Sequence, residues 1–197
     1  MILLLDAMGT VVAEPFVDAV PAFFGTSLAD LVPQLSYETW CAFECGDIDE
    51  DAFRRRFFRD GRDYDHAGLV ATLRDAYRYV RGMEELLADL AAAGVDMHIL
   101  SNYPPWYRMI EDKLRVSRYA AWSFVSCDTG LRKPDPEAFR YACRHLGASP
   151  ADCVFVDDRA DNCAAARDVG LRAIQFEGAR ALRASLAALP ERPLAGA

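Results

Sequence analysis

The sequence predicts an α/β protein with a three-layer, Rossmann-like core: a parallel sheet between helices, carrying a small inserted α-helical cap. Three observations predict this class. Strand-like and helix-like segments alternate from residue 81 onward, as in parallel sheets covered on both faces. A separate apolar run opens the chain at residues 1–5. Between these two regions, residues 14–80 have helical patterns only.

The opening run, Met-Ile-Leu-Leu-Leu, leads directly into Asp6, which is followed by small residues, Gly9 and Thr10. A short continuous apolar run that ends in turn-forming residues is typical of a buried parallel strand. Asp6 would then lie just beyond the C-terminal end of that strand, where open α/β sheets bind their ligands. For this stretch alone, an aspartate that merely caps a turn is the alternative.

Residues 14–80 consist of short amphipathic stretches that end at Gly or Pro, which predicts a small helical bundle. Beyond this insert, we expect four strands, at residues 95–100, 122–128, 153–156 and 171–176. The expected helices of the same region span residues 83–94, 107–115, 134–147, 160–170 and 181–189. The predicted core therefore comprises residues 1–13 and 81–190, with 14–80 as the cap and 191–197 as a disordered tail.

Composition excludes several classes of function. The net charge of −8 argues against nonspecific nucleic-acid binding, which needs a cationic surface to displace counterions. No apolar segment approaches the ~20 residues that span a bilayer, so no membrane partner is expected. The six cysteines are scattered, which favours small core residues in a reducing compartment. We expect a cytoplasmic monomer or homodimer; the plastid stroma stays open if a transit peptide has been removed.

Polar side chains follow the ends of three predicted strands or lie near them. They are Asp6 and Thr10, Ser101 and Asn102, Lys133 ahead of a helix, and Asp157, Asp158 and Asn162. Because the carboxyl ends of parallel strands meet at one edge of a sheet, these groups should converge. Asp6 with Asp158 could hold Mg²⁺, and Lys133 with Ser101 and Thr10 could bind phosphate oxygens. The carboxylate that faces the phosphorus would then act as a nucleophile and form an aspartyl-phosphate.

Four motifs in this order, D-x-x-G-T, S-N, K-P-D-P and V-D-D-x-x-x-N, resemble those of the haloacid dehalogenase-like (HAD) hydrolase superfamily. The resemblance covers the core from residue 1 to about 176, and the helical insert is similar to the small helical cap of that superfamily. It implies a small-molecule phosphomonoester as substrate and Mg²⁺ as cofactor. It also implies Asp6 as the nucleophile and Lys133 as its partner.

The same resemblance implies roles for the other motif residues. Ser101 and the backbone amide of Asn102 would bind phosphate. Asp158, supported by Asp157, would bind the metal together with the backbone carbonyl of Met8, and Asn162 would orient the acidic loop.

Met8 departs from the usual pattern, because phosphatases of the superfamily commonly have a second aspartate there as general acid and base. Methionine cannot transfer a proton, so a proton must come from water or another residue, or not be needed. Haloacid dehalogenases also lack that aspartate, but the pair Asp157–Asp158 suits a cation and favours a phosphatase. A phosphate- or flavin-binding module without turnover is the third alternative.

Four stretches, DAMGTVVAEPFVDAVPAFFG, FFRDGRDYD, NYPPWYRMIEDKL and RKPDPEAF with FVDDRADN, resemble the plastid flavin mononucleotide (FMN) hydrolases of plants, which share the methionine. This resemblance implies hydrolysis of FMN to riboflavin and phosphate. Trp106 and Tyr107 follow Asn102 closely, so we expect them to stack on a flat ring of the substrate. The aromatic residues of the insert, such as Trp40 and Phe43, are expected mainly to fill the core of the cap.

Overall fold

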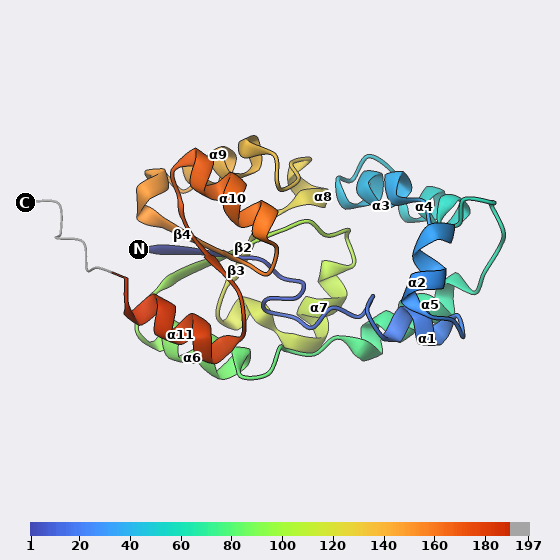
Figure 1. Cartoon of the computed structure of the whole chain (residues 1–197), viewed down its shortest axis with the longest axis horizontal. Helices are drawn as coiled ribbons and strands as arrows, with labels where there is room; N and C mark the ends of the chain where they lie inside the picture. Colours follow the sequence, from blue (N-terminus) through green and yellow to red (C-terminus); the bar gives the residue numbers. More distant parts are fainter. Residues whose placement is uncertain (190–197) are drawn as a thin grey trace, which may run out of the picture.

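The computed structural model describes residues 1–189, so the predicted tail at 191–197 lies outside the described residues. Five parallel strands form one sheet in the order β3-β2-β1-β4-β5 (Figure 1). The strands are β1 (Ile2–Leu5), β2 (Asp96–Ser101), β3 (Ala121–Val125), β4 (Cys153–Asp157) and β5 (Arg172–Gln175). The strand from the start of the chain is thus the central one, and the predicted α/β fold class is confirmed.

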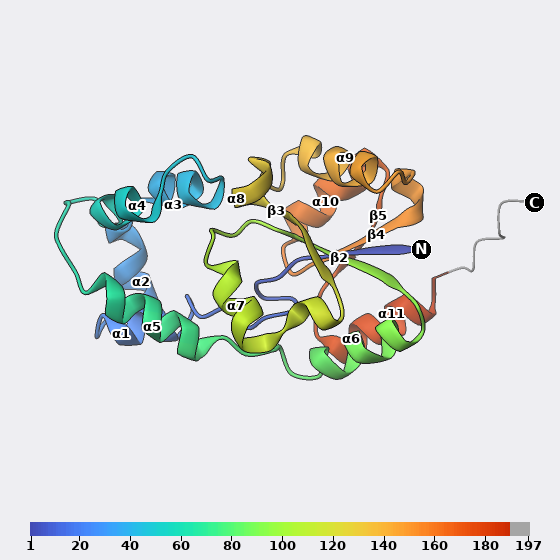
Figure 2. The ribbon, with the colours of Figure 1, turned by 180° about the vertical axis from the view of Figure 1, so that it is seen from behind.

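Helices cover both faces of the sheet (Figures 1 and 2). One face carries α9 (Pro136–His145) and α10 (Ala160–Val169), and the other carries α6 (Met83–Ala92) and α11 (Ala179–Ala187). Alternate residues of β1 serve the two faces: Leu4 packs with Phe139 and Phe155, whereas Leu3 and Leu5 join a second cluster with Leu86. All three leucines are fully buried, which explains the continuous apolar run.

Two further helices lie near the C-terminal ends of the strands. They are α7 (Tyr107–Leu114), which follows β2, and the short α8 (Ser126–Thr129), which follows β3 directly. Short 3-10 turns cover Val116–Arg118 and Pro150–Asp152. Among residues 1–189, none of the helices combines the length and the apolarity that crossing a bilayer requires.

The helices of the predicted cap lie together at one end of the molecule, beyond the C-terminal ends of the strands (Figures 1 and 2). They are α1 (Ala19–Phe23), α2 (Leu28–Leu31), a 3-10 turn (Val32–Gln34), α3 (Tyr37–Glu44), α4 (Glu50–Arg56) and α5 (His66–Ala76). Side chains of Ser27, Ser36, Asp49 and Asp65 cap four of these helices at their N-termini.

Aromatic rings fill the interior of this helical segment. Phe43 stacks on Phe53 with ring centroids 4.5 Å apart, and Phe57 and Phe58 are also buried. The segment joins the core through two paired linkers: the amide of Ala13 donates to the carbonyl of Arg78, and the amide of Val80 donates to the carbonyl of Val11. The exact domain boundaries stay a prediction.

Candidate active site

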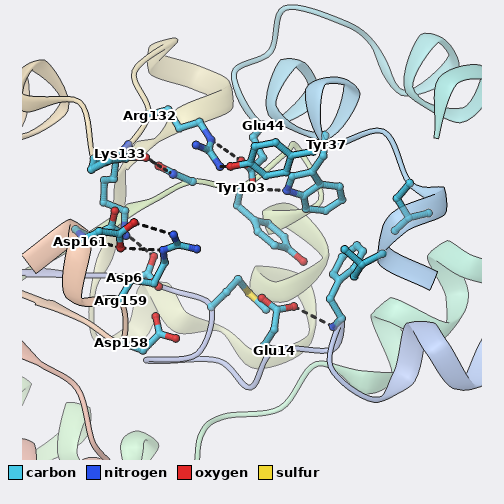
Figure 3. Close-up of a pocket in the computed structure, with 18 of the residues that line it drawn as sticks. Asp6, Glu14, Tyr37, Glu44, Tyr103, Arg132, Lys133, Asp158, Arg159 and Asp161 are labelled. Carbon is cyan, nitrogen blue, oxygen red and sulfur yellow. Dashed lines mark hydrogen bonds and ion pairs between the residues drawn. The ribbon is translucent and has the colours of Figure 1, made fainter. Parts of the chain in front are cut away.

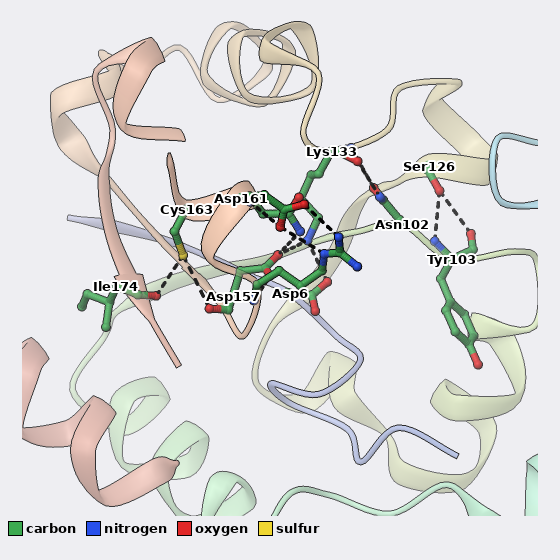
Figure 4. Close-up of polar contacts among 11 residues, drawn as sticks. Asp6, Asn102, Tyr103, Ser126, Lys133, Asp157, Asp161, Cys163 and Ile174 are labelled. Atoms are coloured by element: carbon green, nitrogen blue, oxygen red, sulfur yellow. Dashed lines mark hydrogen bonds and ion pairs between the residues drawn. The ribbon is translucent and has the colours of Figure 1, made fainter. Parts of the chain in front are cut away.

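Lys133 lies between two carboxylates at the C-terminal edge of the sheet (Figure 4). Its Nζ is 2.7 Å from Oδ1 of Asp6 and 2.6 Å from Oδ2 of Asp157. Asp6 follows β1 and Asp157 ends β4, and the parallel register that pairs Leu5 with Val156 places the two aspartates at the same level. Lys133 is 2% exposed and Asp157 is completely buried. Sheet pairing therefore brings Asp6 and Asp157 together, and Lys133 joins them from a loop.

The loop that carries Lys133 is held by Asn102, which follows β2. The side chain of Asn102 donates to the carbonyl of Lys133 and accepts from its amide, each at 2.8 Å (Figure 4). The side chain of Asn102 thus fixes the loop, which leaves only its backbone amide for the predicted phosphate contact. Sequence reasoning had assigned this residue to phosphate binding and missed its part in positioning Lys133.

The two neighbouring aspartates of the acidic motif have different surroundings. Asp157 accepts hydrogen bonds from Nδ2 of Asn162 at 3.0 Å and from the amide of Arg159 at 2.8 Å, in addition to the bond from Lys133. None of the ion pairs among residues 1–189 involves Asp158, which is exposed. Asp157 is thus committed to holding Lys133 and Asn162, whereas the carboxylate of Asp158 is available to a ligand.

Asp6, Asp157 and Asp158 form a group suited to a divalent cation. Each offers a carboxylate oxygen, and the three oxygens lie within 4.8 Å of one another. Oxygen ligands of this kind are preferred by Mg²⁺. A Cβ at Gly9 would come within 2.7 Å of Oδ2 of Asp158, and Gly9 has a φ of +76°. The glycine of the first motif therefore permits the close approach of Asp158.

Two buried hydroxyl groups at this edge have no protein partner. Oγ1 of Thr10 and Oγ of Ser101 make no hydrogen bond within the described part of the chain, and both residues are buried. Buried hydroxyls in folded proteins normally have a partner, supplied by protein or ligand. Both residues are predicted to contact phosphate, and a hydroxyl without a protein partner is available for such a contact.

Electrostatics at this edge favour an added cation. Burial raises the pKa of Asp6 above its usual range, against the opposing effect of Lys133. Burial and the neighbouring charge of Asp157 also raise the pKa of Asp158. Burial alone would lower the pKa of Lys133, but the charges of Asp6 and Asp157 raise it, so its ammonium stays protonated. The single positive charge of Lys133 does not balance the negative charges of Asp6, Asp157 and Asp158. A divalent cation would add positive charge and stabilise the ionised carboxylates.

A cavity of about 810 Å³ connects this edge to the helical segment (Figure 3). One end, here called the carboxylate end, contains Asp6, Lys133 and Asp158. The other end, here called the aromatic end, is lined by Phe16, Tyr37, Trp40 and Glu44, together with the side chain of Arg132, which reaches Glu44 from the loop of Lys133. This volume is large enough for a ligand of several rings.

Comparison with known proteins decides the family. The model of haloacid dehalogenase-like hydrolases matches residues 34–170. A flavin mononucleotide hydrolase of Arabidopsis thaliana is 46% identical over 95% of this chain and 77% of its own length. This chain is a haloacid dehalogenase-like hydrolase. A sesquiterpene phosphatase of Aspergillus oryzae is 30% identical over 74% of this chain and 76% of its own length. The predicted superfamily, the phosphatase class and the resemblance to FMN hydrolases are thereby confirmed.

Solved structures share the fold of this HAD-like hydrolase. A HAD family enzyme of Bacteroides thetaiotaomicron, in complex with magnesium and inorganic phosphate, has a TM-score of 0.72 at 19% identity and covers 89% of this chain and 93% of its own. The L-2-haloacid dehalogenase of Xanthobacter autotrophicus has a TM-score of 0.66 at 18% identity, over 98% of this chain and 85% of its own. At these identities the likeness shows the fold alone.

Neither Trp106 nor Tyr107 of this HAD-like hydrolase is among the residues that line the cavity, so their contact with substrate stays a prediction. Trp106 is buried among rings of the helical segment, with its centroid 5.4 Å from that of Phe53. The hydroxyl of Tyr107 donates to Asp128 at 2.8 Å on the surface. Tyr103, which follows Asn102 directly, lines the cavity and was not predicted.

Several charged or aromatic residues that line the cavity were not predicted as site residues. They include Glu14, Tyr37, Glu44 and Arg132. Glu14 follows the first motif, and burial raises the pKa of its carboxyl to about 7. Arg132 immediately precedes the K-P-D-P motif, and this adjacency is the one signal in the sequence that could have drawn attention to it.

Proposed function

We propose that this HAD-like hydrolase is a Mg²⁺-dependent phosphomonoesterase that hydrolyses FMN to riboflavin and phosphate through an aspartyl-phosphate on Asp6. The observation that carries the proposal is the contact of Lys133 with both Asp6 and Asp157, beside Asp158 and at the head of a large cavity. The 46% identity to the Arabidopsis FMN hydrolase supports the choice of substrate.

In the proposed reaction, Asp6 attacks the phosphorus and other residues of the site hold the phosphoryl group. A carboxylate oxygen of Asp6 forms a bond to phosphorus while the bond from phosphorus to the ester oxygen breaks, and riboflavin leaves. Lys133 and the hydroxyls of Thr10 and Ser101 would hold the phosphoryl oxygens. Water then attacks the phosphorus and releases Asp6 and inorganic phosphate. Met8 cannot supply the proton that the leaving oxygen takes up, so we assign that proton to water in the cavity.

Mg²⁺ would be held by Asp6, Asp158 and the backbone carbonyl of Met8, with Asp157 in support. When bound, it would neutralise the negative charge that otherwise keeps a carboxylate and a phosphate dianion apart. The three grouped carboxylate oxygens support this assignment.

Dehalogenation and binding without turnover are the competing functions. The fold is shared with the L-2-haloacid dehalogenase, so the fold does not decide between them. The carboxylate group favours the phosphatase, because attack on a haloacid needs no cation site. A protein that only binds its ligand would not need a buried lysine in contact with the carboxylate that faces the phosphate.

Phosphate release from FMN by the purified protein, with Mg²⁺ and with EDTA, tests the proposal. We expect turnover with Mg²⁺ and its loss in EDTA. Release of halide from 2-chloropropionate in EDTA would support the dehalogenase instead. FMN that binds but stays intact over hours would support the binding module.

The expected monomer or homodimer, the absence of nucleic-acid and membrane partners, and the cytoplasmic location stay predictions. The Arabidopsis relative is named as a chloroplast protein, which keeps the plastid stroma open.

A further inference from the structure

A second charged cluster lines the cavity at its aromatic end (Figure 3). Nε of Arg132 donates to Oε2 of Glu44 at 2.8 Å, and Nη2 of Arg132 donates to the hydroxyl of Tyr37 at 3.2 Å. The other oxygen of Glu44 accepts from the indole Nε1 of Trp40. Arg132 belongs to the loop of Lys133, whereas the other three residues belong to α3. The cluster therefore joins the helical segment to the catalytic loop across the cavity.

The buried ion pair between Arg132 and Glu44 costs desolvation free energy at a position where apolar side chains could pack instead. Glu44 is 5% exposed, and burial raises its pKa against the opposing effect of Arg132. Replacing a buried ion pair by apolar residues is often neutral or stabilising, so stability alone is a weak reason for one. Arg132 and Glu44 both line the cavity that Asp6 also lines. Their position points to a ligand at this end.

The end of α3 is fixed in place, which keeps the pair in a constant position. The backbone carbonyl of Glu44 accepts a hydrogen bond from Ser126 of α8, and the amide of Tyr103 donates to the same hydroxyl at 3.0 Å. A Cβ at Gly46 would lie 2.5 Å from the carbonyl oxygen of Cys127, so α3 and α8 meet in close contact. A preorganised pair of this kind loses little entropy when a ligand binds.

The groups that surround the pair define the kind of ligand. The rings of Phe16 and Trp40 meet edge to face at 4.6 Å, and Tyr37 and Trp40 line the same wall. Aromatic walls of this kind suit a flat ring. The guanidinium supplies hydrogen-bond donors and the carboxylate supplies an acceptor. A planar heteroaromatic ring with carbonyl oxygens and an N–H group on one edge matches both.

We infer that Arg132 and Glu44 determine specificity by binding the polar edge of a planar heteroaromatic leaving group, while Tyr37 and Trp40 contact its face. This inference rests on the proposed function and deepens it. Acetyl phosphate has no ring for the pair to bind, so it reports the chemistry at the carboxylate end alone. Riboflavin has the ring without the phosphate, so it reports the aromatic end alone.

The test compares Arg132→Met and Glu44→Gln with the parent enzyme in the presence of Mg²⁺. We expect kcat/KM for FMN to fall about 10- to 100-fold, mainly through KM, which is the scale of a lost hydrogen bond to a charged group. Turnover of acetyl phosphate should change less than about twofold. Inhibition by riboflavin should weaken in parallel with FMN turnover, whereas inhibition by inorganic phosphate should stay the same.

Two controls keep this test interpretable. Arg55→Met removes an exposed arginine of α4 that pairs with Asp51 outside the cavity, and it should leave both substrates unaffected. Tyr37→Phe removes only the hydroxyl bonded to Arg132, and it should raise KM for FMN by a few-fold. If Arg132→Met does not fold, KM for FMN in Tyr37→Phe still tests whether this cluster contributes to binding.

Different results would overturn the inference and the proposed function. Equal losses on FMN and acetyl phosphate would mean that Arg132 acts only through Lys133, which overturns the inference. Unchanged FMN turnover and riboflavin inhibition in both variants would also overturn it, with the proposed function intact. A parent enzyme that hydrolyses acetyl phosphate but neither hydrolyses FMN nor binds riboflavin would overturn FMN as substrate, and the inference with it.

Discussion

The two ends of the cavity are built in different ways. At the carboxylate end, Asp6 follows β1 and Asp157 ends the neighbouring β4, and backbone pairing sets their separation. At the aromatic end, Glu44 belongs to a helix and Arg132 to a loop, and side-chain contacts alone join them. In the function we propose, chemistry thus depends on the sheet, whereas selectivity depends on packing between two segments. Changes at the carboxylate end should affect every substrate, and changes at the aromatic end should affect FMN alone.

The largest effect is expected for Asp6→Asn, which keeps the shape of the side chain but removes the nucleophile. Turnover of FMN and of acetyl phosphate should both fall roughly a thousandfold or more. Phosphate release measures both rates, and Asp51→Asn on exposed α4 is the matched control. Release at the parental rate by Asp6→Asn would show that another group attacks the phosphorus.

Lys133→Met should be nearly as severe, and it should also lower stability. Removing the ammonium leaves Asp6 and Asp157 as buried, unpaired carboxylates. Breaking a buried ion pair in this way costs about 3 kcal/mol or more, measurable by urea unfolding at pH 7. Turnover of both substrates should fall roughly a hundredfold. A variant as stable as the parent would show that Lys133 does not neutralise the two carboxylates.

Asp158→Asn should weaken the response to Mg²⁺ without unfolding the protein. Mg²⁺ should raise the thermal midpoint of the parent, because a ligand that binds only the folded state stabilises it. The variant should need roughly tenfold more Mg²⁺ for the same rise and for half-maximal turnover of either substrate. Asp161→Asn, which removes a nearby carboxylate outside the metal-suited group, should respond like the parent. Equal responses of Asp158→Asn and the parent would place the cation elsewhere.

Glu14→Gln should have the smallest effect on turnover, and its effect should fall on stability. Burial raises the pKa of this carboxyl from 4.5 to about 7, so the folded chain binds its proton more tightly than the unfolded chain. The stability of the parent should therefore fall as pH rises from about 4.5 to about 7. Relative to the parent, Glu14→Gln should gain roughly 3 kcal/mol between pH 4 and pH 8 in urea unfolding with EDTA. A constant difference would mean that Glu14 titrates normally.

Sequence reasoning reached much of the fold and of the carboxylate end, because both follow from short-range patterns. Leu3, Leu4 and Leu5 are apolar on both faces of a central strand, and the polar residue that follows them must lie at its edge. The pairing of Asn102 with the backbone of Lys133 was not predicted, because an amide side chain at a strand end looks the same whether it binds a ligand or a loop.

The aromatic end could not be predicted in the same way. Glu44 ends a short helix, and a carboxylate there looks solvent-exposed in the sequence, yet contact with Arg132 and Trp40 buries it. The burial of Trp106 against Phe53 could not be predicted either, since which side of a turn a ring faces depends on tertiary packing. The expectation that Phe43 fills the core of the helical segment is confirmed.

The paired linkers have a consequence for how this enzyme could change its substrate range. Val12 and Tyr79 form an antiparallel bridge, so the chain leaves the sheet domain and returns to it at one point. Excision of everything between them would not alter the order or register of the strands. A foreign helical module joined at Ala13 and Arg78 would therefore inherit the proposed nucleophile while bringing its own selectivity, and such exchange offers a short evolutionary route to new phosphatases.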